Sequence, residues 1–211
     1  MSKPSIQKAK LYVVVDRAVL KGRNPVDVAA AAVRGGADLL QWRDKTGPDR
    51  EFLETARRLR ELTRRQGVLF IVNDRVSTAI LAQADGVHVG HEDLAVPEVR
   101  SLVGSSMLIG RSTHSLEEAL EAQRQGADYI GVGPVFGTPT KPSYPPVGLE
   151  LVRQVRERVR IPWVAIGGID LENAGLVSSA GAACVAVVRA VAAASDPEAA
   201  ARALKGKLIS S

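Results

Sequence analysis

The sequence predicts an α/β protein that folds as a single-domain (β/α)8 TIM barrel, and three observations favour this fold. Eight short apolar segments rich in β-branched residues alternate with helical patterns along the chain. The 211 residues suit one domain and lie at the short end of the range for such barrels. A Gly-Ala-Asp-like motif precedes every second strand. An open, doubly wound parallel sheet is the alternative arrangement of these elements.

The predicted strands are short runs dominated by Val, Ile and Leu. They cover residues 11–15, 39–43, 68–72, 86–89, 107–110, 129–133, 163–166 and 184–188. The predicted helices cover residues 26–34, 51–65, 76–82, 97–103, 116–124, 149–158, 171–178 and 197–204. Eight strands, each followed by a helix, indicate a closed barrel. We therefore expect one domain over residues 1–211, with residues 1–10 as a loose N-terminal extension.

A weak internal repeat supports closure of the barrel. The even-numbered strands are introduced by Gly36-Ala37-Asp38, Ala84-Asp85-Gly86, Gly126-Ala127-Asp128 and Gly181-Ala182-Ala183. One unit for every two strands is the repeat expected of a quarter-barrel. Glycine is also the favoured residue just after a helix, so the motif has a second explanation as a helix end. The two explanations are compatible.

Composition narrows the class of protein. Hydrophobic residues make up 45% of the chain and charged residues 24%, which excludes disordered, collagen-like and coiled-coil proteins. No run of about 18 apolar residues is present, and residues 1–10 lack the apolar segment of a signal peptide. We therefore expect a cytoplasmic protein with no membrane partner. The lone Cys184 stands in an apolar run, so we expect a small, buried side chain there.

The net charge of +5 is distributed in a way that argues against a nucleic-acid partner. Arginines gather within residues 57–65 and 153–160, where an apolar stripe at helical spacing indicates the solvated faces of amphipathic helices. Aromatic residues are 4% of the chain and do not interleave with these arginines, so the stacking surface of a single-strand binder is missing. A phosphorylated small molecule is the expected anion. The sequence leaves the oligomeric state open, a homo-oligomer included.

In a TIM barrel the chemistry lies on the loops that follow the strands. After the second strand the chain reads Gln41-Trp42-Arg43-Asp44-Lys45. Alternation along a strand places Gln41, Arg43 and Lys45 on one side, which we expect to face the barrel mouth. An amide, a guanidinium and an ammonium group there suit a polyphosphate attached to a hydrogen-bonding ring. A surface salt-bridge cluster is the alternative.

Two carboxylates follow the next two strands. Asp74 comes after the third strand, and Asp93 comes after the fourth. Facing basic residues, they form a Mg²⁺ site if substrate phosphates supply the remaining oxygens. Each aspartate is equally suited to begin the next helix as an N-cap, so both interpretations stay open. We expect His88 and His91 to be structural.

The loops after the later strands carry further candidate anion ligands. The hydroxyl group of Ser112 suits a phosphate or the start of a helix. The long segment 133–148 is expected to be a lid, with Thr138, Thr140 and Lys141 at its centre. Gly167 and Gly168, together with the loop after strand eight, predict a monophosphate site. Two anion sites in one mouth indicate two phosphorylated substrates.

Several of these motifs, in the same order, resemble the thiamine-phosphate synthase (thiamin-phosphate pyrophosphorylase) family. The resemblance covers nearly the whole chain. It rests on Gln41-Trp42-Arg43-Asp44-Lys45, Asn73-Asp74-Arg75-Val76, Asp85-Gly86-Val87-His88-Val89-Gly90 with Glu92-Asp93-Leu94, Ala127-Asp128-Tyr129-Ile130-Gly131-Val132-Gly133-Pro134, Thr138-Pro139-Thr140-Lys141 and Val164-Ala165-Ile166-Gly167-Gly168-Ile169. Several ordered motifs are far more specific than any one of them.

The resemblance implies roles for individual residues. A pyrimidine diphosphate would be held by Gln41, Arg43, Lys45, Asn73 and Lys141, and Ser112 would also touch its pyrophosphate. Mg²⁺, the implied cofactor, would be bound by Asp74 and Asp93. A thiazole phosphate would be bound by Thr138, Thr140, Gly168 and Val188. The predicted substrate-binding set is completed by Trp42, Asp44, Pro139, Gly167 and Arg189.

The family's reaction joins the pyrimidine methylene carbon to the thiazole nitrogen and releases pyrophosphate, with loss of CO2 when the thiazole is carboxylated. Negative charge grows on the departing pyrophosphate, so we expect Arg43, Lys45 and Lys141 to be the catalytic residues. Water would capture the pyrimidine-methyl cation, so a closed lid must exclude it. The reaction needs no general acid or base, which agrees with the missing Ser-His-Asp arrangement.

Two positions depart from the family's usual pattern, and three rival functions remain. Arg189 stands where a small residue such as Ser is usual, and Arg111 stands where an aliphatic residue is usual.

The rival functions are a thiazole tautomerase of the same superfamily, a Schiff-base aldolase that uses Lys45 or Lys141, and a non-catalytic protein that binds thiamine precursors. Asp74 and Asp93 favour the synthase, because a tautomerase has no pyrophosphate to expel.

Overall fold

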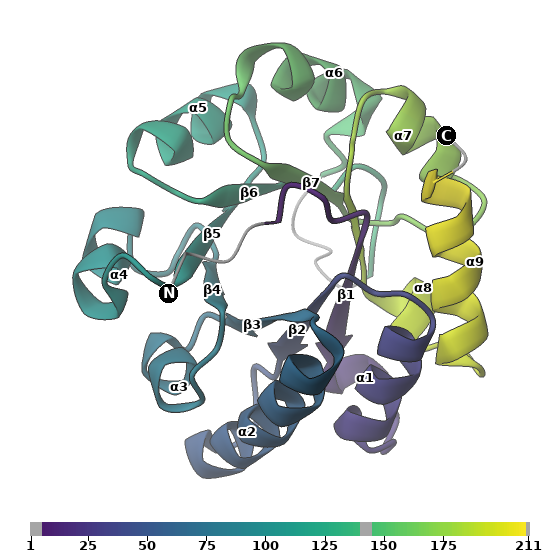
Figure 1. The fold of residues 1–211 in the computed structure, drawn as a ribbon. Coiled ribbons are helices and arrows are strands. Elements are labelled where there is room, and N and C mark those ends of the chain that lie inside the picture. Colours follow the sequence, from purple (N-terminus) through teal and green to yellow (C-terminus); the bar gives the residue numbers. More distant parts are fainter. Residues whose placement is uncertain (1–5, 140–144, 210–211) are drawn as a thin grey trace.

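A computed structural model describes residues 6–139 and 145–209 as a closed barrel of eight parallel strands surrounded by helices (Figure 1). The strands follow one another around the barrel in sequence order. The ring is closed because β1 (Leu11–Asp16) pairs with β8 (Val185–Val187). The predicted TIM barrel is therefore confirmed, and the open doubly wound sheet is excluded.

The predicted strands all form, with ends that differ from the prediction by a few residues. Between β1 and β8 the strands are β2 (Leu39–Arg43), β3 (Leu69–Asn73), β4 (Gly86–Val89), β5 (Leu108–Thr113), β6 (Tyr129–Val132) and β7 (Trp163–Ile166). The largest difference is in β5, which continues through Thr113 because Arg111, Ser112 and Thr113 pair with β6. That extension brings Ser112 onto a strand rather than a loop.

Helices alternate with the strands around the outside of the barrel (Figure 1). They are α1 (Pro25–Arg34), α2 (Asp49–Gln66), α3 (Val76–Leu81), α4 (Val96–Val103), α5 (Leu116–Arg124), α6 (Gly148–Arg158), α7 (Ala174–Ser179), α8 (Arg189–Ala192) and α9 (Pro197–Ile209), with a 3₁₀ helix at Arg17–Val19. The sequence pattern predicted no helix at α8 and a seventh helix that begins at residue 171. Asp170 delays α7 because its Oδ1 accepts the N–H groups of Glu172 and Asn173, a turn that competes with helix.

Alternation along the strands divides the core into two layers. In β2, Leu39 packs inside the barrel, whereas Leu40 and Trp42 pack between the strands and the helices. Trp42 contacts Phe52 of α2, with ring centroids 5.5 Å apart. The interior cluster contains Ile6, Ala9, Tyr12, Leu39, Ile71, Leu108, Tyr129, Val164, Cys184 and Ala186. Cys184 is 4% exposed, so its expected burial is confirmed.

The first described residues pack under the barrel rather than extending from it. Ile6 and Ala9 are buried in the interior cluster. The N–H group of Lys10 donates to the Asp38 carboxylate over 2.7 Å. The expectation of a loose extension over residues 1–10 is therefore wrong for residues 6–10, and residues 1–5 lie outside the described part. Among the described residues, no helix is both long enough and apolar enough to span a bilayer.

The recurring motif before the even-numbered strands ties neighbouring parts of the barrel together. Its three aspartates each accept a backbone N–H group from the beginning of the preceding odd-numbered strand. The pairs are Asp38 with Leu11 (2.9 Å), Asp85 with Phe70 (2.9 Å) and Asp128 with Ile109 (2.8 Å). Each aspartate also forms an ion pair with a helix residue, namely Lys205, Arg60 and Arg100 respectively. The aspartates of the repeat therefore form tertiary contacts between strands and helices. In the fourth copy of the motif, Ala183 stands at the position of the aspartate.

The glycines of the motif also end helices, as the second explanation required. Gly36, Gly126 and Gly181 all have positive φ, between 85° and 113°. This conformation costs an L-residue free energy but is open to glycine. Both explanations of the repeat therefore hold.

Replacing Asp85 with Ala is expected to destabilise the barrel by about 3 kcal/mol, because it leaves the largely buried Arg60 guanidinium and the Phe70 N–H group without their partner. Chemical denaturation measures the loss. Glu54→Ala is the matched control, because Glu54 forms an exposed ion pair with Arg50 on the same helix as Arg60. Equal stability of the Asp85 variant and the control would show that the motif does not tie the strands together.

Candidate active site

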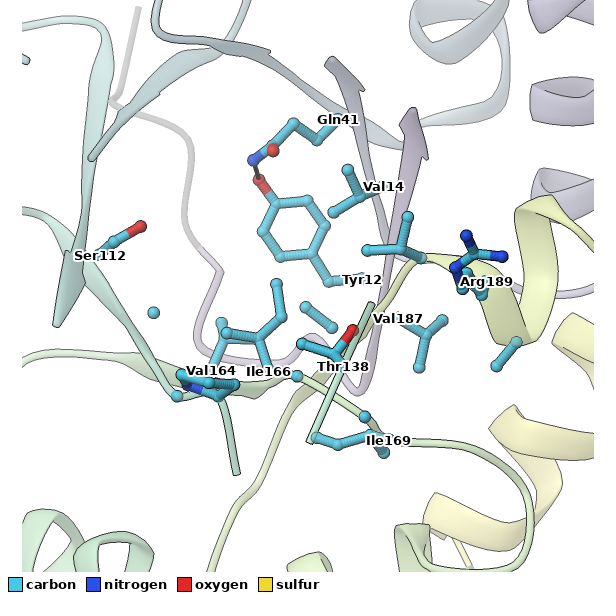
Figure 2. Close-up of a pocket in the computed structure, with 18 of the residues that line it drawn as sticks. Tyr12, Val14, Gln41, Ser112, Thr138, Val164, Ile166, Ile169, Val187 and Arg189 are labelled. Carbon is cyan, nitrogen blue, oxygen red and sulfur yellow. Dashed lines mark hydrogen bonds between the residues drawn. The ribbon is translucent and has the colours of Figure 1, made fainter. Parts of the chain in front are cut away.

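A cavity of about 470 Å³ opens at the carboxyl ends of the strands. Its walls include residues from each of the eight strands or from the segment that follows each strand. Figure 2 shows Gln41, Tyr12 and Ser112 among the lining residues, with Arg189 on the far side of the cavity from Ser112. The chemistry was expected at this end of the barrel, and the cavity lies there.

The floor of the cavity is a chain of hydrogen-bonded polar side chains. Gln41 Nε2 donates to Tyr12 Oη over 2.6 Å (Figure 2). The hydroxyl groups of Tyr12 and Tyr129 lie 3.1 Å apart. His88 continues the chain, with Nδ1 at 3.0 Å from Tyr129 Oη and Nε2 at 3.0 Å from Ser112 Oγ. The side chains come from five different strands, so only closure of the barrel assembles them.

Burial keeps the phenol groups of Tyr12 and Tyr129 neutral. Both tyrosines are buried, and burial raises the pKa of each hydroxyl above its ordinary value. Gly110 makes room for the contact between Tyr129 and His88, because a Cβ atom there would lie 2.2 Å from Tyr129 Cζ and 2.4 Å from His88 Nδ1. The two tyrosines therefore present uncharged hydrogen-bonding groups to a ligand.

Arg43 and Asn73 lie at one end of the cavity. Arg43 is mostly buried, and its Nη1 forms an ion pair with Asp16 at the end of β1. Asp16 is 1% exposed, and its other oxygen accepts the N–H group of Ala18. This carboxylate therefore holds the Arg43 guanidinium in place at the cavity wall.

Lys45, Asp74 and Asp93 form a cluster that begins next to Asn73 in the chain, although none of the three is among the residues that line the cavity. Lys45 Nζ forms an ion pair with Asp74, and the Asp74 and Asp93 side chains interact directly. Asp74 has a φ of 58°, a left-handed conformation that aspartate tolerates better than most residues. Such strain is common where a loop must aim a functional side chain. Lys45 is half-exposed and thus open to a ligand from solvent.

The two carboxylates titrate differently because their surroundings differ. Burial raises the pKa of Asp74, and the neighbouring Asp93 raises it further against the effect of Lys45. Burial acts in the same direction on Asp93, but hydrogen bonds from Asp74 and from the Gly90 N–H group, with the positive charges nearby, hold its pKa below the ordinary value. Of the two carboxyl groups, Asp74 is therefore the one that takes up a proton first as the pH falls.

These residues fit a magnesium ion. Two adjacent carboxylates offer oxygen ligands, which Mg²⁺ prefers. No group of three or more His, Cys, Asp or Glu side chains suited to a metal is found within residues 6–139 and 145–209. The pair would therefore hold Mg²⁺ only together with water and substrate phosphate oxygens, which is the usual arrangement for this ion.

The other end of the cavity combines glycine backbone with Arg189. Gly167, Gly168, Thr138 and Pro139 line this end, and Val188 and Arg189 complete it. Arg189 is exposed, and the described residues include no ion-pair partner for it. An unpaired guanidinium beside accessible backbone is suited to a phosphate group.

Gly167 and Gly168 also make a close contact between two loops possible. Both have positive φ, and a Cβ atom on Gly168 would lie 2.7 Å from the carbonyl oxygen of Gly137. The Phe136 N–H group donates to the Gly167 carbonyl over 3.0 Å. The first part of the expected lid therefore rests on the glycine pair. Thr140 and Lys141, which the sequence analysis placed at the centre of the lid, lie outside the described residues.

Two residues predicted to bind substrate face away from the cavity. Trp42 is fully buried in the layer between strands and helices, where the Arg17 guanidinium lies 5.6 Å from its ring centroid. Asp44 is 4% exposed, pairs with Arg17, and accepts the N–H groups of Thr46 and Gly47. Alternation along β2 explains both positions, because it turns these side chains to the face opposite Gln41 and Arg43. Trp42 and Asp44, both placed in the predicted substrate-binding set, are therefore absent from the cavity wall.

Sequence analysis missed three residues of the cavity floor. Tyr12 and Tyr129 were given no role in the site, although Tyr129 belongs to one of the family motifs, and His88 was expected to be structural, yet all three line the cavity. Their signal was the alternation that placed Gln41 inside the barrel, applied to β1, β4 and β6. Polar side chains at interior positions of a barrel strand indicate either a site or a satisfied core network, and here they form both.

Comparisons with known proteins show the family to which the chain belongs. The profile of the thiamine monophosphate synthase family matches residues 11–191. A thiamine-phosphate synthase from Chloroflexus aurantiacus is 51% identical over 206 residues, which cover 97% of this chain and 95% of the relative. One from Shouchella clausii is 48% identical over 196 residues, covering 92% and 94% respectively.

A solved structure shares the fold and much of the sequence. Thiamine phosphate pyrophosphorylase from Pyrococcus furiosus superposes with a TM-score of 0.90 at 41% identity, and the match covers 96% of each chain. Likeness at this level extends across the whole barrel, including the segments that form the cavity. The chain therefore belongs to the thiamine monophosphate synthase family, as its motifs predicted.

Proposed function

We propose that this chain condenses 4-amino-2-methyl-5-(diphosphooxymethyl)pyrimidine with a thiazole phosphate to form thiamine phosphate and pyrophosphate. The observation that carries the proposal is the pair of unlike ends in one cavity. Strands β2 and β3 supply Arg43 and Asn73 on one side of the ring, next in the chain to Lys45 and Asp74, and the segments after β7 and β8 supply the glycine pair and Arg189 on the other. Family membership supplies the reaction class.

In the proposed reaction, the bond between the pyrimidine methylene carbon and the pyrophosphate oxygen breaks, and the electron pair leaves with pyrophosphate. The lone pair of the thiazole nitrogen then forms the new C–N bond. A carboxylated thiazole also loses CO2. Bound at Asp74 and Asp93, Mg²⁺ would neutralise charge on the pyrophosphate. Because that charge grows as the bond breaks, Arg43 and Lys45 stabilise the transition state more than the ground state.

The remaining residues bind and shield the substrates in this proposal. Gln41 offers an amide to the pyrimidine ring, and its orientation is set by the hydrogen bond to Tyr12. Ser112, oriented by His88, faces the pyrophosphate. The buried phenol groups of Tyr12 and Tyr129 stay neutral, so they offer no phenolate base to a reactive cation. The lid over residues 133–148, with Lys141 as a further catalytic cation and Thr140 as a phosphate ligand, stays part of the proposal.

The direct test is product formation. The purified protein is incubated with the pyrimidine diphosphate and thiazole phosphate, with and without Mg²⁺, and thiamine phosphate is measured by mass spectrometry. We expect Mg²⁺-dependent product. Binding of both compounds without turnover would instead indicate a precursor-binding protein, and isomerisation of the thiazole alone would indicate a tautomerase.

Replacing Arg189 with Ser is expected to raise the KM for thiazole phosphate about tenfold, because one charge-assisted contact to the phosphate is lost. The KM for the pyrimidine diphosphate and kcat should change little. Steady-state kinetics with each substrate varied in turn provides the measurement. The unphosphorylated thiazole serves as the internal control, since its use should not depend on Arg189. An unaltered KM for thiazole phosphate would show that Arg189 points away from the bound ligand.

A further inference from the structure

Arg111 connects the strand that carries Ser112 to the loop that carries Asp93. It lies on β5, where alternation turns its side chain away from the cavity that Ser112 faces. Nη1 donates to the Leu94 carbonyl oxygen over 3.0 Å, and Nη2 donates to the His91 carbonyl oxygen over 3.2 Å. The two accepting residues flank Asp93, so one guanidinium spans the turn that presents this carboxylate.

Little burial holds this turn in place. His91, Glu92 and Leu94 are exposed, and Asp93 is only partly buried. Within the turn, the Gly90 N–H group donates to Asp93 Oδ2 over 2.6 Å, and the Asp93 N–H group returns a 3.3 Å bond to the Gly90 carbonyl. These bonds shape the turn locally. The bonds from Arg111 instead fix it relative to the barrel, because Arg111 belongs to a strand of the sheet.

The geometry suits arginine in particular. A planar guanidinium has several donors in fixed directions, so it can bond two carbonyl oxygens at once, whereas a lysine offers a single point charge. The charge of Arg111 also lies close enough to Asp93 to lower the pKa of that carboxyl. An aliphatic residue at this position would provide neither effect.

The neighbouring loop is held in the same way. Arg75, which follows β3, donates through Nη2 to the carbonyl oxygens of Asp44 (3.1 Å) and Gly47 (2.7 Å). These two residues flank Lys45, just as His91 and Leu94 flank Asp93. Two of the three loops that supply the Lys45–Asp74–Asp93 cluster, those of Lys45 and Asp93, are therefore each bound by an arginine from the next strand or the turn after it.

We propose that Arg111 is a positioning residue that preforms the Asp93 side of the divalent-cation site. It touches neither substrate nor cation, and it acts by holding the turn at residues 90–94. The proposal rests on the cation site of the proposed function. It predicts that loss of Arg111 weakens cation binding while the barrel stays intact.

The test compares Mn²⁺ binding by the wild type and by Arg111 variants. Binding is measured by electron paramagnetic resonance in the presence of inorganic pyrophosphate. Arg111→Leu is expected to weaken Mn²⁺ binding about tenfold. Arg111→Lys, which keeps the charge but not the two-carbonyl geometry, should recover only part of the loss. Full recovery with lysine would overturn the positioning role in favour of a charge effect.

Arg100→Leu is the matched control. Arg100 also donates to two backbone carbonyls, those of Gly104 and Met107, both at 2.8 Å, but it does so at the opposite end of the same α4–β5 unit. Its loss should lower stability and leave Mn²⁺ binding unchanged. Equal weakening of Mn²⁺ binding in the Arg100 and Arg111 variants would overturn the proposal, because the effect would then come from general loosening.

Hydrogen exchange provides a readout that needs no cation. Amides 91–95 should exchange faster in Arg111→Leu than in the wild type, with amides of β4 and β5 unchanged.

Asp93→Asn distinguishes failure of the cation site from failure of the positioning role of Arg111. If Asp93→Asn weakens Mn²⁺ binding and Arg111→Leu does not, only the positioning role fails. If Asp93→Asn binds Mn²⁺ as well as the wild type, the cation site itself fails, and the role of Arg111 fails with it.

Discussion

Replacing Asp93 with Asn is expected to lower kcat/KM for thiazole phosphate about a thousandfold, measured with saturating pyrimidine diphosphate and ordinary Mg²⁺ concentrations. Asp93 is one of only two carboxylates in the cluster beside the cavity, and its direct neighbour Asp74 already shares its negative charge with Lys45. An amide is a weaker ligand for a hard cation and carries no charge. The same loss is expected for Asp93→Ala, which removes both oxygens.

The fold should survive these changes at Asp93, because the residue is partly exposed on a surface turn. Circular dichroism and denaturation should therefore match the wild type. Glu92→Gln is the matched control, since Glu92 is the exposed carboxylate next in the chain and is expected to have no part in the reaction. Raising the Mg²⁺ concentration should restore part of the Asp93→Asn activity. Full activity of Asp93→Asn at low Mg²⁺ would remove the metal assignment.

Replacing Arg43 with Met should affect both activity and stability. A guanidinium placed against the departing pyrophosphate contributes to the transition state, and its loss is expected to lower kcat/KM about a thousandfold. The same change strands Asp16, which is 1% exposed and pairs with Arg43. Breaking a buried pair from one side costs about 3 kcal/mol. Kinetics and chemical denaturation measure the two losses separately.

A second substitution separates the two effects of Arg43. In the double variant Arg43→Met/Asp16→Asn, no charge remains stranded, so much of the stability should return. Activity should stay low because the guanidinium is still missing. If activity recovers together with stability, Arg43 supports the fold and takes no direct part in the reaction.

Local pattern was sufficient for the framework and for much of the site. The order of strands and helices followed from apolar spacing, which neighbouring residues in the chain set among themselves. Alternation in β2 correctly turned Gln41 and Arg43 toward the cavity. The same alternation turns Trp42 and Asp44 toward the helices, where both are buried. Their place in the predicted substrate-binding set does not follow from this alternation.

Contacts between segments that are distant in the chain could not be predicted from the sequence. The polar floor needs Tyr12, His88 and Tyr129 to meet, although they lie up to 117 residues apart. Their meeting depends on closure of the ring and on the stagger of the strands. Arg111 looked like a departure from the family's pattern, and only the fold shows that it reaches the two carbonyls beside Asp93.

By itself, the sequence determined the barrel, its order of elements, the family and the loops that carry the charged groups, because periodicity and motifs are local properties of the chain. The tertiary structure alone decided how those loops are held. The motif aspartates became ties between strands, residues 6–10 became part of the core, and arginines came to bind neighbouring loops. Such contacts depend on the relative placement of elements, which is fixed only when the whole ring packs.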